Sequence, residues 1–169
     1  MLGIKIIIYS FIFLSTSLIG ILISKKYASR VVELKEFKVA LNMFKTKMKF
    51  TYEPIPEIFR EISFSINSNI GSVFEIASNN MKLLAAGRAW DLALETDILS
   101  IAEEDKNILK NLSKLLGKTD VEGQVSQIEI TENFLDEQIS KAEIEKSKSE
   151  KLYRTLGVII GMGIVIILM

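Results

Sequence analysis

The chain has 169 residues, which suits a single domain, and its 21 Lys and Arg balance its 21 Asp and Glu. That balance gives no electrostatic case for nucleic-acid binding. The chain contains neither cysteine nor histidine, which excludes disulfides, thiol redox chemistry, His-dependent triads and cysteine or imidazole metal ligands. We therefore expect no catalytic residue, no metal, no cofactor and no small-molecule substrate.

Residues 1–23 form the first predicted element, a transmembrane helix. Residues 6–23 carry no charge over a length that can cross the hydrocarbon core of a bilayer. A cleaved secretory signal is the alternative, but the apolar run is longer than usual and no small-residue cleavage site follows it. The cations that come next, Lys25, Lys26 and Arg30, favour an uncleaved helix.

The stretch from Val31 to Tyr52 is predicted to continue this helix without a break. Its apolar residues recur at intervals of three and four, which forms a narrow face for packing against another helix. These residues are Leu34, Phe37, Leu41, Phe44 and Met48. Pro54 and Pro56 end the helix.

Four short helices are predicted next. The first starts at Pro56 and carries Ile58, Phe59, Ile62 and Ile66. A loop at Asn67, Ser68, Asn69 and Gly71 separates it from a second helix that runs through Val73, Phe74, Ala77, Met81 and Leu84 until Gly87. A third opens at Arg88-Ala89-Trp90, and a fourth runs through Ile108 to Leu116 and stops at Gly117.

The chain then returns as a second long helix. Thr119-Asp120-Val121-Glu122 fits a capping box. The apolar face reads Val121, Val125, Ile128, Leu135, Ile139 and Ala142. No proline or glycine interrupts 124–156, so the helix should continue into a second transmembrane helix at 155–169. A buried core helix is the alternative for that last segment.

These elements predict an all-α protein in which two transmembrane helices flank a helical bundle at residues 24–154. Five cations flank the inner end of each span, whereas Lys5 alone lies on the other side. The positive-inside rule therefore places the bundle in the cytosol.

Three local features could carry function. Glu103-Glu104-Asp105 could hold a metal or act in acid/base chemistry, but a solvated helix start explains it better. Trp90 could anchor an interface, although the only Trp of a small helical domain is more often buried in the core. Gly157 and Gly161, with Gly163 beside them, form a small-xxx-small pattern that permits close helix packing.

In its ordered set of residues, the chain resembles the stage III sporulation protein AB family over its whole length. The residues that carry this resemblance are Gly20, Tyr27, Arg30, Pro56-Glu57, Ala89-Trp90, Leu116-Gly117, Asp120, Gln124 and the run Tyr153-Arg154-Thr155-Leu156-Gly157-Val158. The chain departs from the family at Lys47, where an acid is expected.

The resemblance implies a structural membrane component of a sporulation channel or secretion-like apparatus between mother cell and forespore. Implied partners are membrane lipid and other stage III sporulation proteins, including an ATPase. The resemblance also implies a bundle similar to the cytosolic domains of the type II secretion inner-membrane platform protein, in the mother-cell membrane facing the forespore, and it brings no catalytic residue.

We expect the ATPase to dock on the helical tip of the bundle, where the exposed charges Arg60, Glu61, Lys106 and Lys110 are the first candidates. One alternative is a two-span adaptor without enzymatic activity that transmits a signal by helix motion. Another alternative is an enzyme that uses a buried carboxylate.

Overall fold

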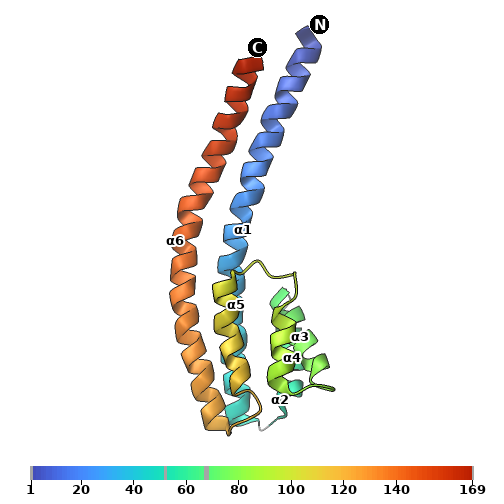
Figure 1. Ribbon diagram of the computed structural model, residues 1–169, viewed down its shortest axis with the longest axis vertical. Helices are drawn as coiled ribbons and strands as arrows, with labels where there is room; N and C mark the ends of the chain where they lie inside the picture. The colour runs from blue at the N-terminus through green and yellow to red at the C-terminus, as the bar shows by residue number, and fades with distance from the viewer. Residues whose placement is uncertain (1, 52, 67–68, 169) are drawn as a thin grey trace. The chain divides into compact units, whose positions relative to one another are not determined.

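The structure is a computed structural model that describes residues 2–51, 53–66 and 69–168. In these ranges the chain forms six α-helices and one short 3-10 helix, with no strand (Figure 1). The chain divides into two compact units. Unit 1 comprises Met1–Val31 and Lys141–Met169, and unit 2 comprises Val32–Ser140.

Two long helices supply residues to both units. Helix α1 is Leu2–Phe50 and helix α6 is Val121–Leu168. Neither contains a proline, so the backbone hydrogen bonding of each continues unbroken. The predictions of two long helices at these places are confirmed.

The segments between α1 and α6 form short helices of unit 2. They are α2 (Ile55–Ser65), α3 (Asn69–Asn80), α4 (Ala86–Leu94), α5 (Glu103–Lys110) and the 3-10 helix η1 (Asn111–Lys114). The predicted loop is wrong at Asn69 and Gly71, because α3 already begins at Asn69. Its other two residues, Asn67 and Ser68, lie outside the described ranges. A Cβ on Gly71 would lie 2.0 Å from the Ile66 carbonyl oxygen, so glycine serves close packing here and not a turn.

The core of unit 2 is a cluster of fully buried aromatic side chains. Phe59 lies 4.9 Å from Phe44, 4.8 Å from Phe74 and 5.5 Å from Trp90 between ring centroids. Trp90 meets Phe37 edge to face at 6.4 Å. Offset or edge-to-face pairs at such distances are favourable. The prediction that Trp90 belongs to the core is confirmed.

The apolar faces of the long helices behave as predicted in most positions. In α1 the five predicted residues of the face are all buried. In α6 Val125, Ile128, Leu135 and Ile139 are buried, whereas Val121, the first residue of the helix, is exposed. The 3.6-residue period of a helix therefore accounts for the core of unit 2.

The turn into α6 is built differently from the predicted capping box. The carboxylate of Asp120, not the hydroxyl of Thr119, accepts the Gly123 N–H, at 2.9 Å. Gln124 holds the turn with both ends of its amide: Oε1 accepts the Gly117 N–H at 3.0 Å, and Nε2 donates to the Thr119 carbonyl at 3.0 Å. Gly117 has a φ of 72°, which favours glycine.

Among the residues that the structure describes, no helix combines the length and the apolar content that crossing a membrane requires. The structure thus does not identify the transmembrane helices predicted at 1–23 and 155–169. The outermost residues of these two segments, Met1 and Met169, lie outside the described ranges.

Candidate functional site

Helices α2 and α3 line a groove of about 210 Å³ on the surface of unit 2. Its lining residues are Arg60, Phe64, Glu75, Ser78, Asn79 and Lys82. The hydroxyl of Ser78 donates to the Pro56 carbonyl oxygen at 2.8 Å, which ties α3 to the first turn of α2. With the close approach at Gly71, this bond fixes the spacing of the two walls.

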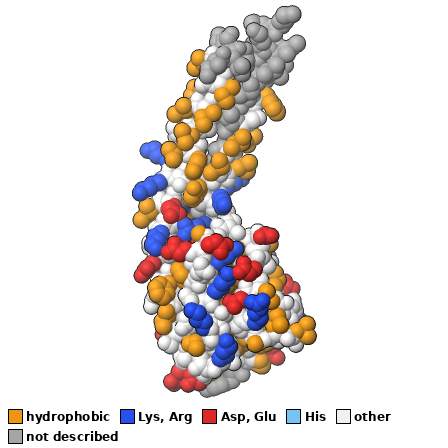
Figure 2. Space-filling model, viewed as in Figure 1, with side chains coloured by type: hydrophobic (Ala, Val, Ile, Leu, Met, Phe, Trp, Pro, Cys, Tyr) orange, Lys and Arg blue, Asp and Glu red, His pale blue; other side chains and the backbone are white. Residues whose placement is uncertain are grey.

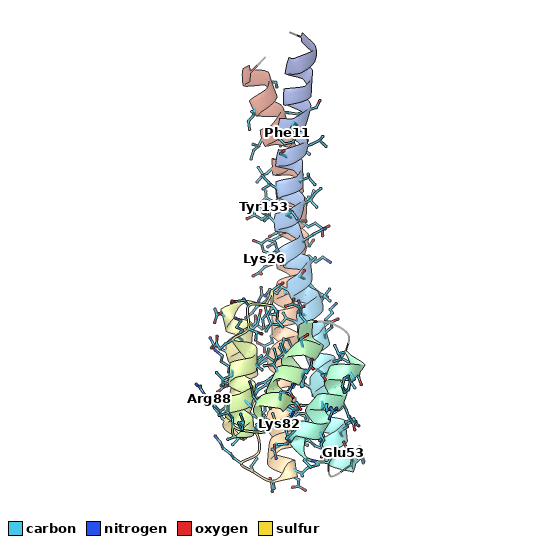
Figure 3. The ribbon with its side chains drawn as sticks, turned by 90° about the vertical axis from the view of Figure 1, so that its right-hand side faces the viewer. Phe11, Lys26, Glu53, Lys82, Arg88 and Tyr153 are labelled. Carbon is cyan, nitrogen blue, oxygen red and sulfur yellow. The ribbon has the colours of Figure 1, made fainter. Side chains whose placement is uncertain are left out.

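Exposed apolar side chains lie at the groove and beside it. Phe64 is 73% exposed, and Leu83, in the turn after α3, is 91% exposed. The guanidinium of Arg60 lies 5.8 Å from the centre of the Phe64 ring, close enough for a cation–π contact. Lys82 donates to the Asn79 side-chain oxygen at 3.0 Å and is labelled in Figure 3. We name this surface the α2–α3 face and define it by Arg60, Phe64, Lys82 and Leu83.

The four residues that the sequence suggested for docking lie on two different helices. Arg60 and Glu61 belong to α2, whereas Lys106 and Lys110 belong to α5. Arg60 forms part of the α2–α3 face. The other three are engaged in ion pairs: Glu61 with Lys47, Lys106 with Glu103 at 3.3 Å, and Lys110 with Glu95 at 2.5 Å.

These pairs change the titration of their members. The hydrogen bond from Lys110, together with its charge, lowers the pKa of Glu95, and the same hydrogen bond raises the pKa of Lys110. The hydrogen bond to Glu61 likewise raises the pKa of Lys47. Lys47 is the position at which the chain departs from the family pattern, and here it completes an ion pair within unit 2. A partner would therefore have to compete with internal pairs at Glu61 and Lys110.

Sequence reasoning missed Phe64, Lys82 and Leu83. The signal for Phe64 was its position outside the apolar face of α2, which is made of the buried residues Ile58, Phe59 and Ile62. Packing in the core does not account for a large aromatic residue on the polar side of a short helix. Leu83 gave no such signal, because its exposure depends on α3 ending at Asn80.

The acid cluster at the start of α5 is used to build the fold. Asp105 is fully buried and its carboxylate accepts the Ala102 N–H at 2.9 Å, which caps the helix. Glu104 accepts from the Gln138 amide at 2.9 Å. Asp105 is thus not the solvated acid that the sequence suggested. Throughout 2–51, 53–66 and 69–168, no group of three or more acidic residues is arranged to hold a metal ion.

Unit 1 displays a second surface, which is apolar. Figure 2 shows hydrophobic side chains gathered over the described part of unit 1, while acidic and basic side chains mix over unit 2. Phe11 is 72% exposed, and Leu14, Leu18, Leu22, Ile159, Ile160 and Ile166 are also exposed. Contiguous apolar surface of this kind marks an interaction with protein or membrane.

The glycines of the predicted packing motif lie in the same unit. Gly157 and Gly161 are buried and Gly163 is half-buried. A Cβ on Gly163 would meet no heavy atom within 4 Å, so the chain itself does not require glycine there. A role for these three residues in helix packing stays a prediction.

Comparison with known proteins identifies relatives of this chain in sequence and in fold. A curated relative, the stage III sporulation protein AB of Bacillus subtilis (strain 168), is 23% identical over 163 residues, which cover 94% of this chain and 95% of the relative. A solved structure of stage III sporulation protein AB (SpoIIIAB) superposes with a TM-score of 0.67 at 19% identity, over 71% of this chain and 98% of that one.

The likeness to the solved structure shows that the two proteins share a fold. The model of the family described as stage III sporulation protein AB matches residues 5–169. This confirms the resemblance that the sequence indicated: the chain belongs to the stage III sporulation protein AB family.

Proposed function

We propose that this protein is a non-enzymatic structural component of the stage III sporulation apparatus, and that unit 2 docks a cytosolic ATPase of that apparatus. The observation that carries the proposal is the α2–α3 face, where exposed Phe64 lines one groove with the cations Arg60 and Lys82 and with Glu75. Exposed Leu83 follows Lys82 in the chain. Aromatic and arginine side chains are enriched in protein interfaces, and charges at the rim guide association. The favoured partner surface is apolar with acidic residues around it.

Membrane anchoring is the second part of the proposal. In the sequence, residues 6–23 and the stretch after Arg154 carry no charge, and the described side chains of these segments are largely exposed in unit 1. Lipid would cover them. Residues 24–154 would then lie in the cytosol of the mother cell, facing the forespore, beside other membrane subunits. The likeness to the type II secretion inner-membrane platform protein stays a prediction.

A signal-transducing adaptor is the alternative function, and one observation favours it. Helices α1 and α6 contain 49 and 48 residues without a break and contribute to both units. A rotation or shift of either helix in unit 1 could change unit 2 directly. A scaffold requires no such change, so a variant that blocks helix motion separates the two functions.

The docking proposal predicts that charge reversal on the α2–α3 face weakens ATPase binding. We expect Arg60→Glu with Lys82→Glu to lower the affinity at least tenfold, about 1.4 kcal/mol, and Phe64→Ala to lower it similarly. The matched control is Lys114→Glu with Lys118→Glu, which makes the same charge change in η1 and the following turn. Binding is measured by interferometry with the purified full-length protein in detergent and the ATPase of the apparatus, beside sporulation efficiency of cells carrying the same variants.

Two results would overturn the assignment of this face. In the first, Lys106→Glu with Lys110→Glu abolishes binding while the α2–α3 variants bind normally, which would place docking on α5. In the second, all reversals leave binding and sporulation intact, while Gly157→Leu with Gly161→Leu abolishes sporulation. Function would then reside in the packing of the glycine-bearing helix.

A further inference from the structure

An open groove of about 500 Å³ lies along α6 in unit 1. It is lined by Ser147, Lys148, Lys151, Leu152 and Thr155, all of which are exposed. These positions recur at intervals of three and four, so they share one face of the helix. Across 2–51, 53–66 and 69–168, no carboxylate lies within ion-pair distance of Lys148 or Lys151.

The neighbouring contacts of unit 1 explain why this face stays open. Tyr153, on the other side of α6, stacks on Tyr27 of α1 with ring centroids 6.0 Å apart and planes 19° apart. Arg30 donates to Glu145 at 2.6 Å. Since these contacts bind α6 to α1 through other residues, the Lys148–Lys151 face is left for an outside ligand.

The groove offers hydrogen-bond donors of one chemical kind. Its lining carries two ammonium groups and two hydroxyl groups and includes no carboxylate. Donors of this kind suit a phosphate oxyanion, for which lysine acts as a point charge.

Apolar side chains continue the same face beyond the donors. Leu152 is 54% exposed, and Leu156 and Ile159, which lie one turn after Leu152 and Thr155, also have exposed surface. A ligand that fits both parts must join an anionic phosphate to hydrocarbon. A free phosphate or a nucleic acid would use the donors and leave the apolar turns uncovered.

We propose that the groove formed by Ser147, Lys148, Lys151, Leu152 and Thr155 binds the headgroup of an anionic phospholipid, with the first part of an acyl chain along Leu156 and Ile159. The inference rests on the proposed membrane location, and it adds a lipid preference and the residues that provide it. Basic residues at a membrane surface contribute to such attraction, and pockets of basic side chains bind anionic headgroups.

The experiment measures lipid retention by the full-length protein in uncharged detergent. Native mass spectrometry follows titration with phosphatidylglycerol or with phosphatidylcholine of the same chains. The wild type should retain phosphatidylglycerol in preference to phosphatidylcholine. Lys148→Gln with Lys151→Gln should lower this affinity roughly thirty-fold, the loss expected for two lysines at an anionic surface. Lys114→Gln with Lys118→Gln makes the same charge change in unit 2 and should leave retention unaltered.

The outcomes separate this inference from the proposed function. Equal retention of phosphatidylglycerol by the wild type and the Lys148/Lys151 variant would overturn the assignment of the groove as a lipid site. Displacement of phosphatidylglycerol by inorganic phosphate at equal concentration would overturn it as well. Insertion into neutral phosphatidylcholine vesicles, tested by flotation in alkaline carbonate, depends on the membrane location alone. Failure to insert would overturn that location, whereas insertion with unselective lipid retention overturns the headgroup site only.

Discussion

Helices α1 and α6 each contribute residues to both units. The apolar side chains of α1 are buried in unit 2 but exposed in unit 1. In unit 2, Phe37 and Phe44 of α1 are fully buried. In unit 1, Phe11 of the same helix is 72% exposed and Leu22 is 61% exposed. The backbone of α1 is α-helical in both units. The units therefore differ in how apolar and charged side chains are arranged along that helix.

The difference shows how a single helix can suit two environments. In unit 2 the apolar residues of α1 recur every three or four positions with charges between them, and the short helices cover that stripe. In unit 1 the apolar residues occupy all sides of the helix, and one neighbouring helix cannot cover them. Unit 2 is therefore stabilised by its own core, whereas many of the described apolar side chains of unit 1 remain exposed.

The sharpest way to break this comparison is to truncate one large apolar residue in each unit. Trp90→Ala removes a fully buried ring that packs on Phe59 and Phe74 and donates to the Leu109 carbonyl at 2.9 Å. We expect the free energy of unfolding to fall by about 3–5 kcal/mol. Leu18→Ala, at a 57% exposed site in unit 1, should change it by less than about 0.5 kcal/mol.

Urea unfolding of the full-length protein in detergent, followed by circular dichroism, measures both variants. Phe64→Ala is the matched control inside unit 2, since it removes an exposed aromatic ring and should be nearly neutral. The comparison fails if Leu18→Ala destabilises the protein as much as Trp90→Ala does. Unit 1 would then hold a core of its own.

The sequence predicted most of the helices and most of the core of unit 2, because helical periodicity reports which face is buried. Leu34 to Met48 of α1 and Val125 to Ile139 of α6 are the clearest examples. The burial of Trp90 also followed from its residue type, since a large aromatic side chain in a small helical domain is usually buried in the core. Identity followed from an ordered set of residues and not from any single motif.

Polar residues whose partners are far away in the sequence escaped prediction. Glu132 interrupts the apolar face of α6, but it is buried because Lys45 of α1 donates to it at 2.5 Å. Gln124 entered only through the family resemblance, and its role in the turn needs three-dimensional positions. The α2–α3 face depends on which residues the packing leaves exposed, and no local pattern specifies that.

A buried carboxylate of unit 2 gives a second test of the comparison between the units, with a smaller expected loss in the free energy of unfolding. Glu33 of α1 accepts the Ser100 N–H at 2.6 Å and the Asn69 amide at 3.3 Å, and Asn69 also donates to the Ile98 carbonyl at 2.9 Å. Glu33→Ala should cost about 1.5–3 kcal/mol, because hydrogen bonds to a charged group are lost and the Ser100 N–H is left unpaired. Urea unfolding measures the loss, and faster hydrogen exchange at Ser100 locates it.

The control for this variant lies in unit 1. Glu145→Gln weakens the hydrogen bond from Arg30, where the Glu145 side chain is 52% exposed, and it should cost at most about 1 kcal/mol. Glu33→Gln keeps one carboxamide oxygen as an acceptor and should lose less stability than Glu33→Ala. Should Glu145→Gln prove the more damaging change, polar pairing in unit 1 would matter more than its exposure indicates.

The smallest expected effect concerns the surface of unit 2 and its dependence on pH. The hydrogen bond and charge of Lys110 lower the pKa of Glu95 below its ordinary value of 4.5, so ionised Glu95 favours the folded state. That contribution is complete above the pKa of the unfolded chain and is lost as the pH falls through the lower pKa of the folded state.

Because the pair is exposed and screened by solvent, we expect Glu95→Gln to reduce stability slightly at pH 7. The wild type and the variant should converge in acid, once the pH lies below the lowered pKa of Glu95 in the folded state. Thermal unfolding at the two pH values tests this, with Glu103→Gln, whose carboxylate pairs with Lys106, as the matched control. A difference between Glu95→Gln and wild type that persists unchanged in acid would show that Glu95 acts through packing and not through its charge.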